Sequence, residues 1–243
     1  FTSEQPTYEK IADEMGIIRL SADGEPACYA RHPLVYLVEA ADDICYEIMD
    51  IEDSHKLKIL SFDETADLLL GFFDSIGQQN IHNRIATEQL TDDNEQIVYM
   101  RACVISQLEQ ECVRVFIENE EKILSGEFQG SLIEHISDIP RKAYERCAKM
   151  SKQKIYCSKP VLDVELAGYK IMETLMEQMT EAAVHPDRYY SKQLISRVSS
   201  QYDIHSDNLE TRLMAVIDYI SGMTDVYALD IYQKINGISL PIV

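Results

Sequence analysis

Apolar residues recur at steps of three and four along most of the chain, and this spacing predicts helices. The clearest case lies between residues 34 and 51, where the apolar positions fall on one side of a helix. Pro33 directly before this run suits the first turn of a helix. We expect the apolar side to pack inward, and it consists of Leu34, Leu37, Val38, Ala41, Ile44, Cys45, Ile48 and Ile51.

The same periodicity predicts helices in the rest of the chain. Ser61 and Glu64 have the spacing of a capping box, which opens a helix over residues 63–74. A long helix is expected over residues 92–125, with Ile97, Met100, Val104, Leu108, Val113 and Ile117 facing inward. Shorter helical patterns occupy residues 131–135, 141–152, 164–183, 192–199 and 208–236. Only residues 153–156 have a strand-like composition, so we expect an all-α fold, with residues 1–243 forming a single helical unit.

Composition limits the classes of function. The 42 acidic and 22 basic residues give a formal charge of −20, which argues against a general nucleic-acid binder and against an anionic-membrane protein. No apolar run approaches the roughly 20 residues that a membrane helix needs, so we expect a cytoplasmic protein with no membrane partner. The six cysteines contain no Cys-x-x-Cys pair and are expected to be reduced thiols.

An acidic line runs along the helix predicted at residues 34–51. At about 100° per residue, Asp42, Tyr46 and Asp50 follow one another along the helix, with Asp42 nearest to the apolar side. A carboxylate at the margin of a core needs a partner, and a divalent cation is a natural one. The alternative is a solvated acidic stripe, and the spacing alone leaves both interpretations open.

A basic region stands out against the acidic background. It could receive phosphates, or its cations could pair with acidic neighbours or a second subunit. Tyr144 and Tyr156 lie within it and could stack on a base or serve as half-buried packing residues. The region consists of Arg141, Lys142, Arg146, Lys149, Lys152, Lys154 and Lys159.

Several common site motifs are absent from the sequence. The six histidines form no His-x-x-x-His, His-Glu-x-x-His or His-Asp motif, so the chain contains no complete histidine-rich metal site. No P-loop, Gly-x-Gly-x-x-Gly or Gly-x-Ser-x-Gly motif occurs either. The usual nucleotide-loop and serine-hydrolase interpretations therefore fail.

Four segments resemble the bacterial deoxyguanosinetriphosphate triphosphohydrolases (dGTPases), members of the HD-domain superfamily. The longest, at residues 31–53, reads RHPLVYLVEAADDICYEIMDIED. The others are KIY at residues 154–156, VELAGY at residues 164–169 and VIDYISGMTDVYALD at residues 216–230. The resemblance spans nearly the whole chain and implies an HD-domain-like helical bundle, the C-terminal portion of a larger helical enzyme.

The resemblance implies an activity and residue roles. The family cleaves a deoxynucleoside triphosphate (dNTP) between the sugar 5′ oxygen and the α-phosphorus, releasing the deoxynucleoside and tripolyphosphate. Its members bind Mg²⁺ or Mn²⁺ through a His, a His-Asp pair and a final Asp, which matches Asp42 in this chain. By the same resemblance, Tyr46 contacts phosphate and Asp50 meets the sugar 3′ hydroxyl.

The chain departs from the family in its metal ligands. It contains no His-Asp pair, so three of the four expected ligands are missing, and we expect this fragment alone to be inactive. The expected partners are dGTP or another dNTP and further copies of the chain. The region near Lys149 is a candidate for subunit contacts or for a nucleotide or single-stranded DNA effector. The alternative is a non-catalytic HD-fold oligomeric or regulatory module that binds nucleotide or nucleic acid.

Overall fold

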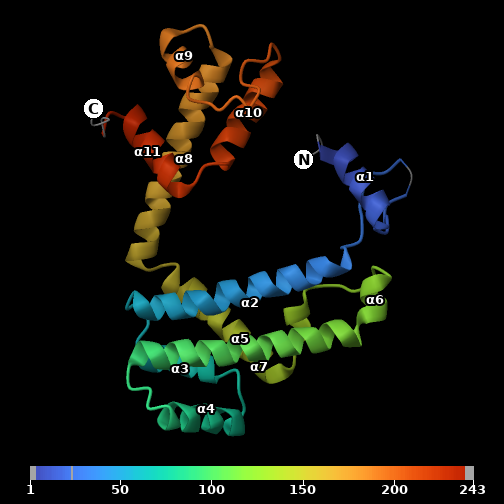
Figure 1. The fold of residues 1–243 in the computed structure, drawn as a ribbon, viewed down its shortest axis with the longest axis vertical. Coiled ribbons are helices and arrows are strands. Elements are labelled where there is room, and N and C mark those ends of the chain that lie inside the picture. Colours follow the sequence, from blue (N-terminus) through green and yellow to red (C-terminus); the bar gives the residue numbers. More distant parts are fainter. Residues whose placement is uncertain (1–3, 23, 239–243) are drawn as a thin grey trace. The chain divides into compact units, whose positions relative to one another are not determined.

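The computed structural model describes residues 4–22 and 24–238, and within these ranges it contains helices and no strand (Figure 1). The expected all-α class is therefore confirmed. An isolated bridge between Arg19 and Tyr29 is the β-type pairing recorded in this part of the chain. The helices are α1 (Gln5–Met15), α2 (Pro33–Lys56), α3 (Phe62–Leu70), α4 (Ser75–Thr87), α5 (Asp93–Glu118), α6 (Glu120–Leu124), η2 (Leu132–His135), α7 (Asp138–Met150), η3 (Ser151–Ile155), α8 (Lys159–Val184), α9 (Tyr189–Ile195), α10 (Leu209–Ser221) and α11 (Asp225–Ile235).

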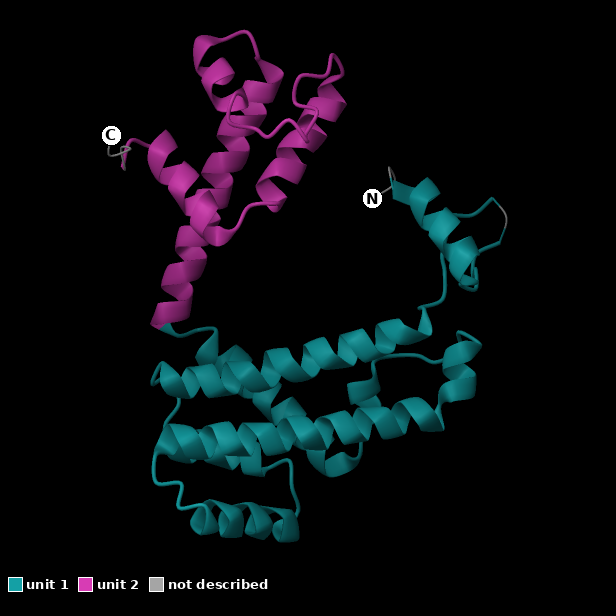
Figure 2. Ribbon diagram, in the orientation of Figure 1, with its two compact units in different colours: residues 1–158 teal, residues 159–243 magenta. Residues whose placement is uncertain are grey.

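The chain divides into two compact units, residues 1–158 and residues 159–243 (Figure 2). The expectation of one helical unit over residues 1–243 does not anticipate this division. Asp42, Tyr46 and Asp50 lie in the first unit, and Lys159 of the basic region lies in the second. No helix in the described ranges is long and apolar enough to cross a membrane.

The first unit is built on the pairing of α2 with α5, which lie side by side (Figure 1). Helix α3 and the short η2 pack against both of them, and α7 packs against α2 and α3. The fully buried side chains of this core include Ile48 and Ile51 from α2, Leu68 and Leu69 from α3, and Val104 and Leu108 from α5.

Local sequence signals start α2 and α3 where expected. Pro33 occupies the first turn of α2, and the His32 side chain accepts a hydrogen bond of 3.2 Å from the Leu34 N–H. The capping box at α3 is confirmed: the Glu64 N–H donates to Ser61 Oγ, and the Ser61 N–H donates to the Glu64 carboxylate.

Other boundaries differ from the prediction. The long helix ends early because the Asn119 side chain donates to the Val115 carbonyl, and α6 starts separately after it. Residues 208–236 form two helices, since Thr224 caps a new helix after the break at Gly222. Residues 151–155 are a π-helix that continues α7, so the strand-like interpretation of residues 153–156 was wrong.

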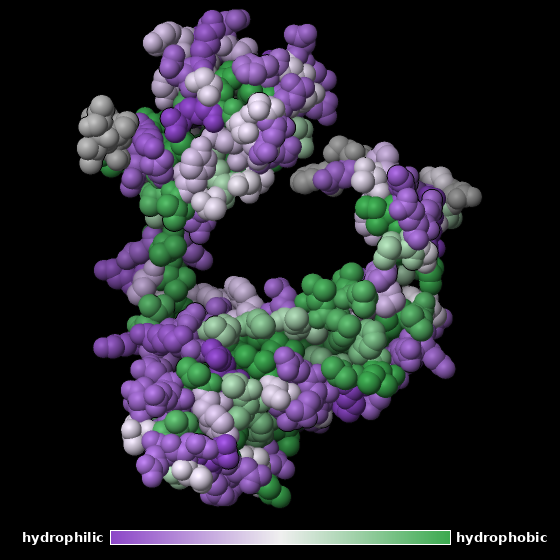
Figure 3. All heavy atoms as spheres, viewed as in Figure 1, coloured by the Kyte–Doolittle hydropathy of each residue, from purple (hydrophilic) through white to green (hydrophobic). Residues whose placement is uncertain are grey.

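The inward side of α2 was only partly predicted. Ile44, Ile48 and Ile51 are buried as expected. The other expected core positions, Leu34, Leu37, Val38, Ala41 and Cys45, are exposed. The apolar stripe of α2 is therefore wider than the side of α2 that packs against α5 and the other described helices (Figure 3). The inward side of α5 was also only partly predicted. Val113 and Ile117 are exposed, whereas Cys112 and Val115 are buried.

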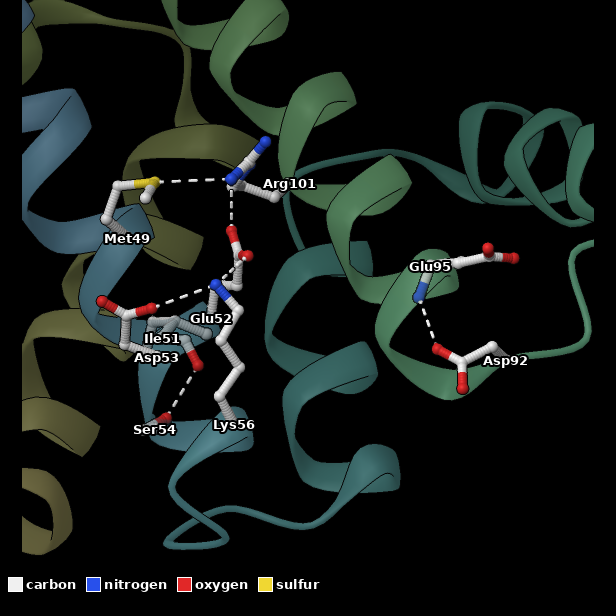
Figure 4. Close-up of polar contacts among 9 residues, drawn as sticks. All are labelled: Met49, Ile51, Glu52, Asp53, Ser54, Lys56, Asp92, Glu95 and Arg101. Atoms are coloured by element: carbon white, nitrogen blue, oxygen red, sulfur yellow. Dashed lines mark hydrogen bonds and ion pairs between the residues drawn. The ribbon is translucent and has the colours of Figure 1, made fainter.

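A buried carboxylate joins α2 to α5 (Figure 4). Glu52 is 2% exposed and contacts Arg101 Nη1 at 2.5 Å and Lys56 Nζ at 2.6 Å. Arg101 Nη1 also lies 3.6 Å from Met49 Sδ. Because Glu52 is removed from water, its charge is compensated by these two cations.

The second unit packs α9, α10 and α11 against α8. Its core includes Leu175, Met179 and Ala183 from α8 with Val216 and Ile220 from α10. The Arg212 guanidinium donates to the Ala183 carbonyl at 2.9 Å and so ties α10 to the end of α8.

Candidate functional site

Asp42, Tyr46 and Asp50 follow one another along α2, as their four-residue spacing predicts. Asp42 is exposed and makes no hydrogen bond or ion pair with another described residue. Tyr46 is 62% exposed, whereas Asp50 is half-buried. The line therefore begins at the solvated carboxylate of Asp42 and ends at the half-buried carboxylate of Asp50.

Tyr156 holds the Asp50 carboxylate. Its hydroxyl donates a hydrogen bond of 2.7 Å to Asp50 Oδ2. Burial raises the pKa of Tyr156, and hydrogen bonds with Asp50 and Tyr46 raise it further, so the phenol keeps its proton at neutral pH. The structure thus brings Tyr46, Asp50 and Tyr156 together, although Tyr156 is 106 positions from Asp50 in the sequence.

Two further contacts fix α2 against α7 and the π-helix η3. The Ser151 hydroxyl donates to the buried Glu47 carboxyl at 2.8 Å, and the Tyr144 hydroxyl donates to the Asp43 carbonyl at 3.1 Å. Burial raises the pKa of Glu47, against the opposing effect of the Ser151 hydrogen bond. Sequence reasoning missed Glu47, because a glutamate in an acidic helix is usually solvated.

The basic region is partly neutralised by acidic neighbours. Arg141 pairs with Asp138 at 2.8 Å and with Glu145 at 2.7 Å. Arg146 pairs with Asp67, and Lys154 pairs with Glu64 at 2.6 Å. The other cations of the basic region that lie in the first unit, Lys142, Lys149 and Lys152, are exposed and form no ion pair with a described residue. The pairing interpretation therefore accounts for part of the region and leaves three cations available.

The Lys154–Glu64 pair also secures η3, which leads into Tyr156, against α3. Hydrogen bonds from Lys154 and from Ser61 lower the pKa of Glu64 to about 2. Because the pKa of Glu64 is lower in the folded state than in the unfolded chain, the ionised Glu64 stabilises the fold at pH values above 4.5. This stabilisation is lost as the pH falls from 4.5 toward 2.

We expect Lys154→Met to raise the pKa of Glu64 toward 4.5, because the largest cause of its depression is removed. Carbon-detected NMR of the side-chain carboxyl over an acid titration measures this directly. Lys152→Met is the matched control, since Lys152 forms no ion pair with a described residue. Equal Glu64 titrations in the two variants would show that Lys154 does not hold Glu64.

The described residues contain no group of three or more His, Cys, Asp or Glu side chains that could hold a metal ion. Asp42 by itself offers one carboxylate, which supplies fewer oxygen ligands than Mg²⁺ or Mn²⁺ takes. The described residues by themselves therefore form no metal site around Asp42.

A cavity of about 660 Å³ lies between the first half of α2, η2 and α7. Arg31 and Arg141 line it together with Glu39 and Asp43. Its lining does not include Asp42, Tyr46 or Asp50. Burial, followed by the charges of Glu39, Asp42 and Glu134, raises the pKa of Asp43.

Comparison with known proteins indicates which family the chain resembles. A family profile described as "Phosphohydrolase-associated domain" matches residues 135–234. A deoxyguanosinetriphosphate triphosphohydrolase-like protein of Pseudomonas aeruginosa (strain LESB58) is 28% identical over 246 residues, which cover 99% of this chain and 54% of that protein. A protein of the same name from Synechocystis sp. is 30% identical over 242 residues, covering 99% of this chain and 52% of that protein.

The chain corresponds to the C-terminal portion of the deoxyguanosinetriphosphate triphosphohydrolase-like family. The deoxyguanosinetriphosphate triphosphohydrolase of Yersinia pestis (strain Pestoides F) is also similar, at 26% identity over 93% of this chain and 52% of that protein. This dGTPase-family chain spans about half the length of the curated relatives that it matches. The family assignment made from the sequence is therefore confirmed.

Proposed function

We propose that this chain supplies part of the active site of a metal-dependent dNTP triphosphohydrolase, which releases the deoxynucleoside and tripolyphosphate. The observation that carries the proposal is the line of Asp42, Tyr46 and Asp50 on α2, with Asp50 oriented by Tyr156. The names of the relatives support a phosphohydrolase role. The full protein, meaning this chain together with the additional length found in the relatives, is the proposed enzyme.

Asp50 is suited to accept a hydrogen bond from a sugar hydroxyl. Tyr156 contacts Oδ2 at 2.7 Å, and a carboxylate retains further lone pairs for a second donor. The hydrogen bond from Tyr156 fixes the rotamer of Asp50, so a sugar 3′ hydroxyl meets an acceptor that is already oriented. Tyr46 is 62% exposed, and its hydroxyl can donate to a phosphate oxygen one helical turn along α2.

The unpaired cations of the basic region are suited to a polyphosphate. Lys149 and Lys152 are exposed on α7 and η3, the elements that lead to Tyr156. Cations near a triphosphate stabilise its negative charge and the charge that develops on the leaving group. We infer that these lysines offset the acidic character of the chain at the site.

Asp42 would provide one ligand to Mg²⁺ or Mn²⁺, and the other ligands would come from outside this chain. A bound divalent ion polarises a phosphoryl oxygen and activates water for attack on phosphorus. The exposure of Asp42 and its lack of a described partner support a role that another part of the protein completes.

We expect Asp50→Ala in the full protein to reduce the preference for dGTP over GTP by about 10-fold to 100-fold, the effect of losing a hydrogen bond to a charged group. Without Asp50 the sugar is no longer fixed through its 3′ oxygen and can shift to admit a 2′ hydroxyl. The measurement is kcat/KM for both nucleotides. Asp53→Ala is the control, because Asp53 is exposed and only pairs with Lys56 on the helix surface. Unchanged discrimination would rule out the sugar-binding role.

The proposal as a whole is tested by incubating the full protein with each dNTP in turn, with and without Mg²⁺ or Mn²⁺. Ion-exchange chromatography then separates nucleosides from nucleotides. Metal-dependent release of a deoxynucleoside supports the enzyme. Tight nucleotide binding with no product from any dNTP would contradict it and favour the non-catalytic regulatory module.

A further inference from the structure

The π-helix η3 is attached to α2 by side-chain hydrogen bonds at both of its ends. At its start, the Ser151 hydroxyl donates to Glu47 Oε1 at 2.8 Å. Directly after its end, the Tyr156 hydroxyl donates to Asp50 Oδ2 at 2.7 Å. Glu47 and Asp50 are three positions apart in α2, and residues at this spacing are neighbours on a helix surface. The segment that carries Tyr156 therefore has two fixed points on one side of α2.

A backbone hydrogen bond joins the two ends of η3. The Tyr156 N–H donates to the Ser151 carbonyl at 2.9 Å, across the five positions that define a π-turn. In an α-helix, residues five positions apart lie about 140° apart around the axis, so they face different sides. The wider π-turn brings the fifth residue closer to the side of the first. Ser151 and Tyr156 can therefore both reach α2, and Ser151 belongs to both contacts.

The two hydrogen bonds to α2 differ in burial. Glu47 is 7% exposed and Ser151 is 1% exposed, whereas Tyr156 and Asp50 are half-buried. An apolar pair of the same shape would stabilise a buried junction about as well as the Glu47–Ser151 hydrogen bond does. A directional hydrogen bond, in contrast, also fixes the relative position of the two backbones. The buried contact is therefore suited to setting the position of η3 on α2.

We propose that Glu47 and Ser151 are positioning residues for the sugar of the substrate. Through the π-turn they set the place of Tyr156 against Asp50, and so they determine how strongly the enzyme recognises a 3′ hydroxyl. Neither residue contacts the substrate itself. The inference rests on the proposed function for the sugar-binding role of Asp50, whereas the contacts that place Tyr156 are independent of it.

The sugar readout compares dGTP with dideoxy-GTP, which lacks the 3′ hydroxyl. We expect Ser151→Ala in the full protein to lower the ratio of kcat/KM for dGTP to kcat/KM for dideoxy-GTP by about tenfold, because a small displacement of a positioning group has effects of this size. The loss should come from dGTP, with dideoxy-GTP nearly unaffected. A purely structural role for Ser151 would lower both values equally. An unchanged ratio would therefore overturn the proposal.

Two further variants separate positioning from burial. Ser54→Ala is the matched control, because Ser54 is also 1% exposed but its hydroxyl donates to the Ile51 carbonyl within α2. It should keep the wild-type ratio. Glu47→Gln retains an oxygen acceptor for Ser151 and should keep the ratio within about twofold, whereas Glu47→Ala should lose it. An equal fall in Ser54→Ala and Ser151→Ala, or in Glu47→Gln and Glu47→Ala, would contradict the positioning role.

A second readout needs no activity. Fluorotyrosine incorporated at position 156 of the full protein reports the surroundings of the phenol by fluorine NMR, and Asp50→Ala gives the resonance of a phenol without its carboxylate. Ser151→Ala should move the wild-type resonance toward that position, and an unmoved resonance would overturn the proposal. A moved resonance in a protein that hydrolyses no dNTP would refute the proposed function alone. Hydrolysis with both readouts unchanged in Ser151→Ala would refute the positioning role alone.

Discussion

Replacing Asp42 with alanine in the full protein is expected to lower dNTP hydrolysis by about a thousandfold or more, with little change in melting temperature. The first expectation follows because a metal ligand supports several kcal/mol of transition-state stabilisation, and each 1.4 kcal/mol corresponds to a factor of ten in rate. The second follows because Asp42 is exposed and has no described hydrogen bond or ion pair to lose.

The Asp42→Ala experiment needs kcat at saturating Mg²⁺ or Mn²⁺, together with the metal concentration that gives half-maximal rate. Asp53→Ala is again the control, since it also removes an exposed carboxylate from α2. Turnover of Asp42→Ala within a few-fold of wild type would eliminate Asp42 as a metal ligand. A large fall in both variants would instead indicate a general effect of charge on α2.

Replacing Glu52 with alanine is expected to lower the free energy of unfolding by about 3 kcal/mol, the lower end of the range for breaking a buried ion pair. Glu52 is 2% exposed and compensates Arg101, whose side chain is 25% exposed. Without Glu52, the Arg101 charge would retain only the Met49 sulfur as a described contact (Figure 4). The junction of α2 and α5 would weaken as a result.

Urea unfolding followed by circular dichroism measures the Glu52 effect. Glu118→Ala is the matched control, because Glu118 pairs with Arg114 but its side chain is 57% exposed. An exposed pair of this kind contributes about 0.5 kcal/mol or less. Similar losses in the two variants would show that burial of Glu52 does not strengthen its ion pairs.

Local signals in the sequence were sufficient to predict where α2 and α3 begin. Pro33 and the Ser61–Glu64 capping box act within one helical turn, so a short window of sequence contains all their partners. The spacing of Asp42, Tyr46 and Asp50 likewise predicts one line, because α2 is regular over that stretch. These features depend on the neighbouring residues alone.

Features that depend on distant parts of the chain were not predicted. Tyr156 reaches Asp50 across 106 positions, and no pattern in a single sequence reports such a contact. The burial of Glu52 was not predicted for the same reason, since its partner Arg101 lies on another helix. Periodicity also marked Val38 as apolar and therefore inward, but Val38 is 70% exposed, because periodicity does not report which side of a helix its neighbours cover.

The central claim is that this chain forms part of an enzyme that removes an intact tripolyphosphate from a dNTP. Phosphorus NMR of dGTP incubated with the full protein and Mg²⁺ or Mn²⁺ tests it most directly, with the Asp42→Ala variant as the control. The account predicts tripolyphosphate resonances with the wild-type protein, little or none with the variant, and no orthophosphate or pyrophosphate as the first product. Release of pyrophosphate or orthophosphate from dGTP, or undiminished tripolyphosphate formation by Asp42→Ala, would contradict it.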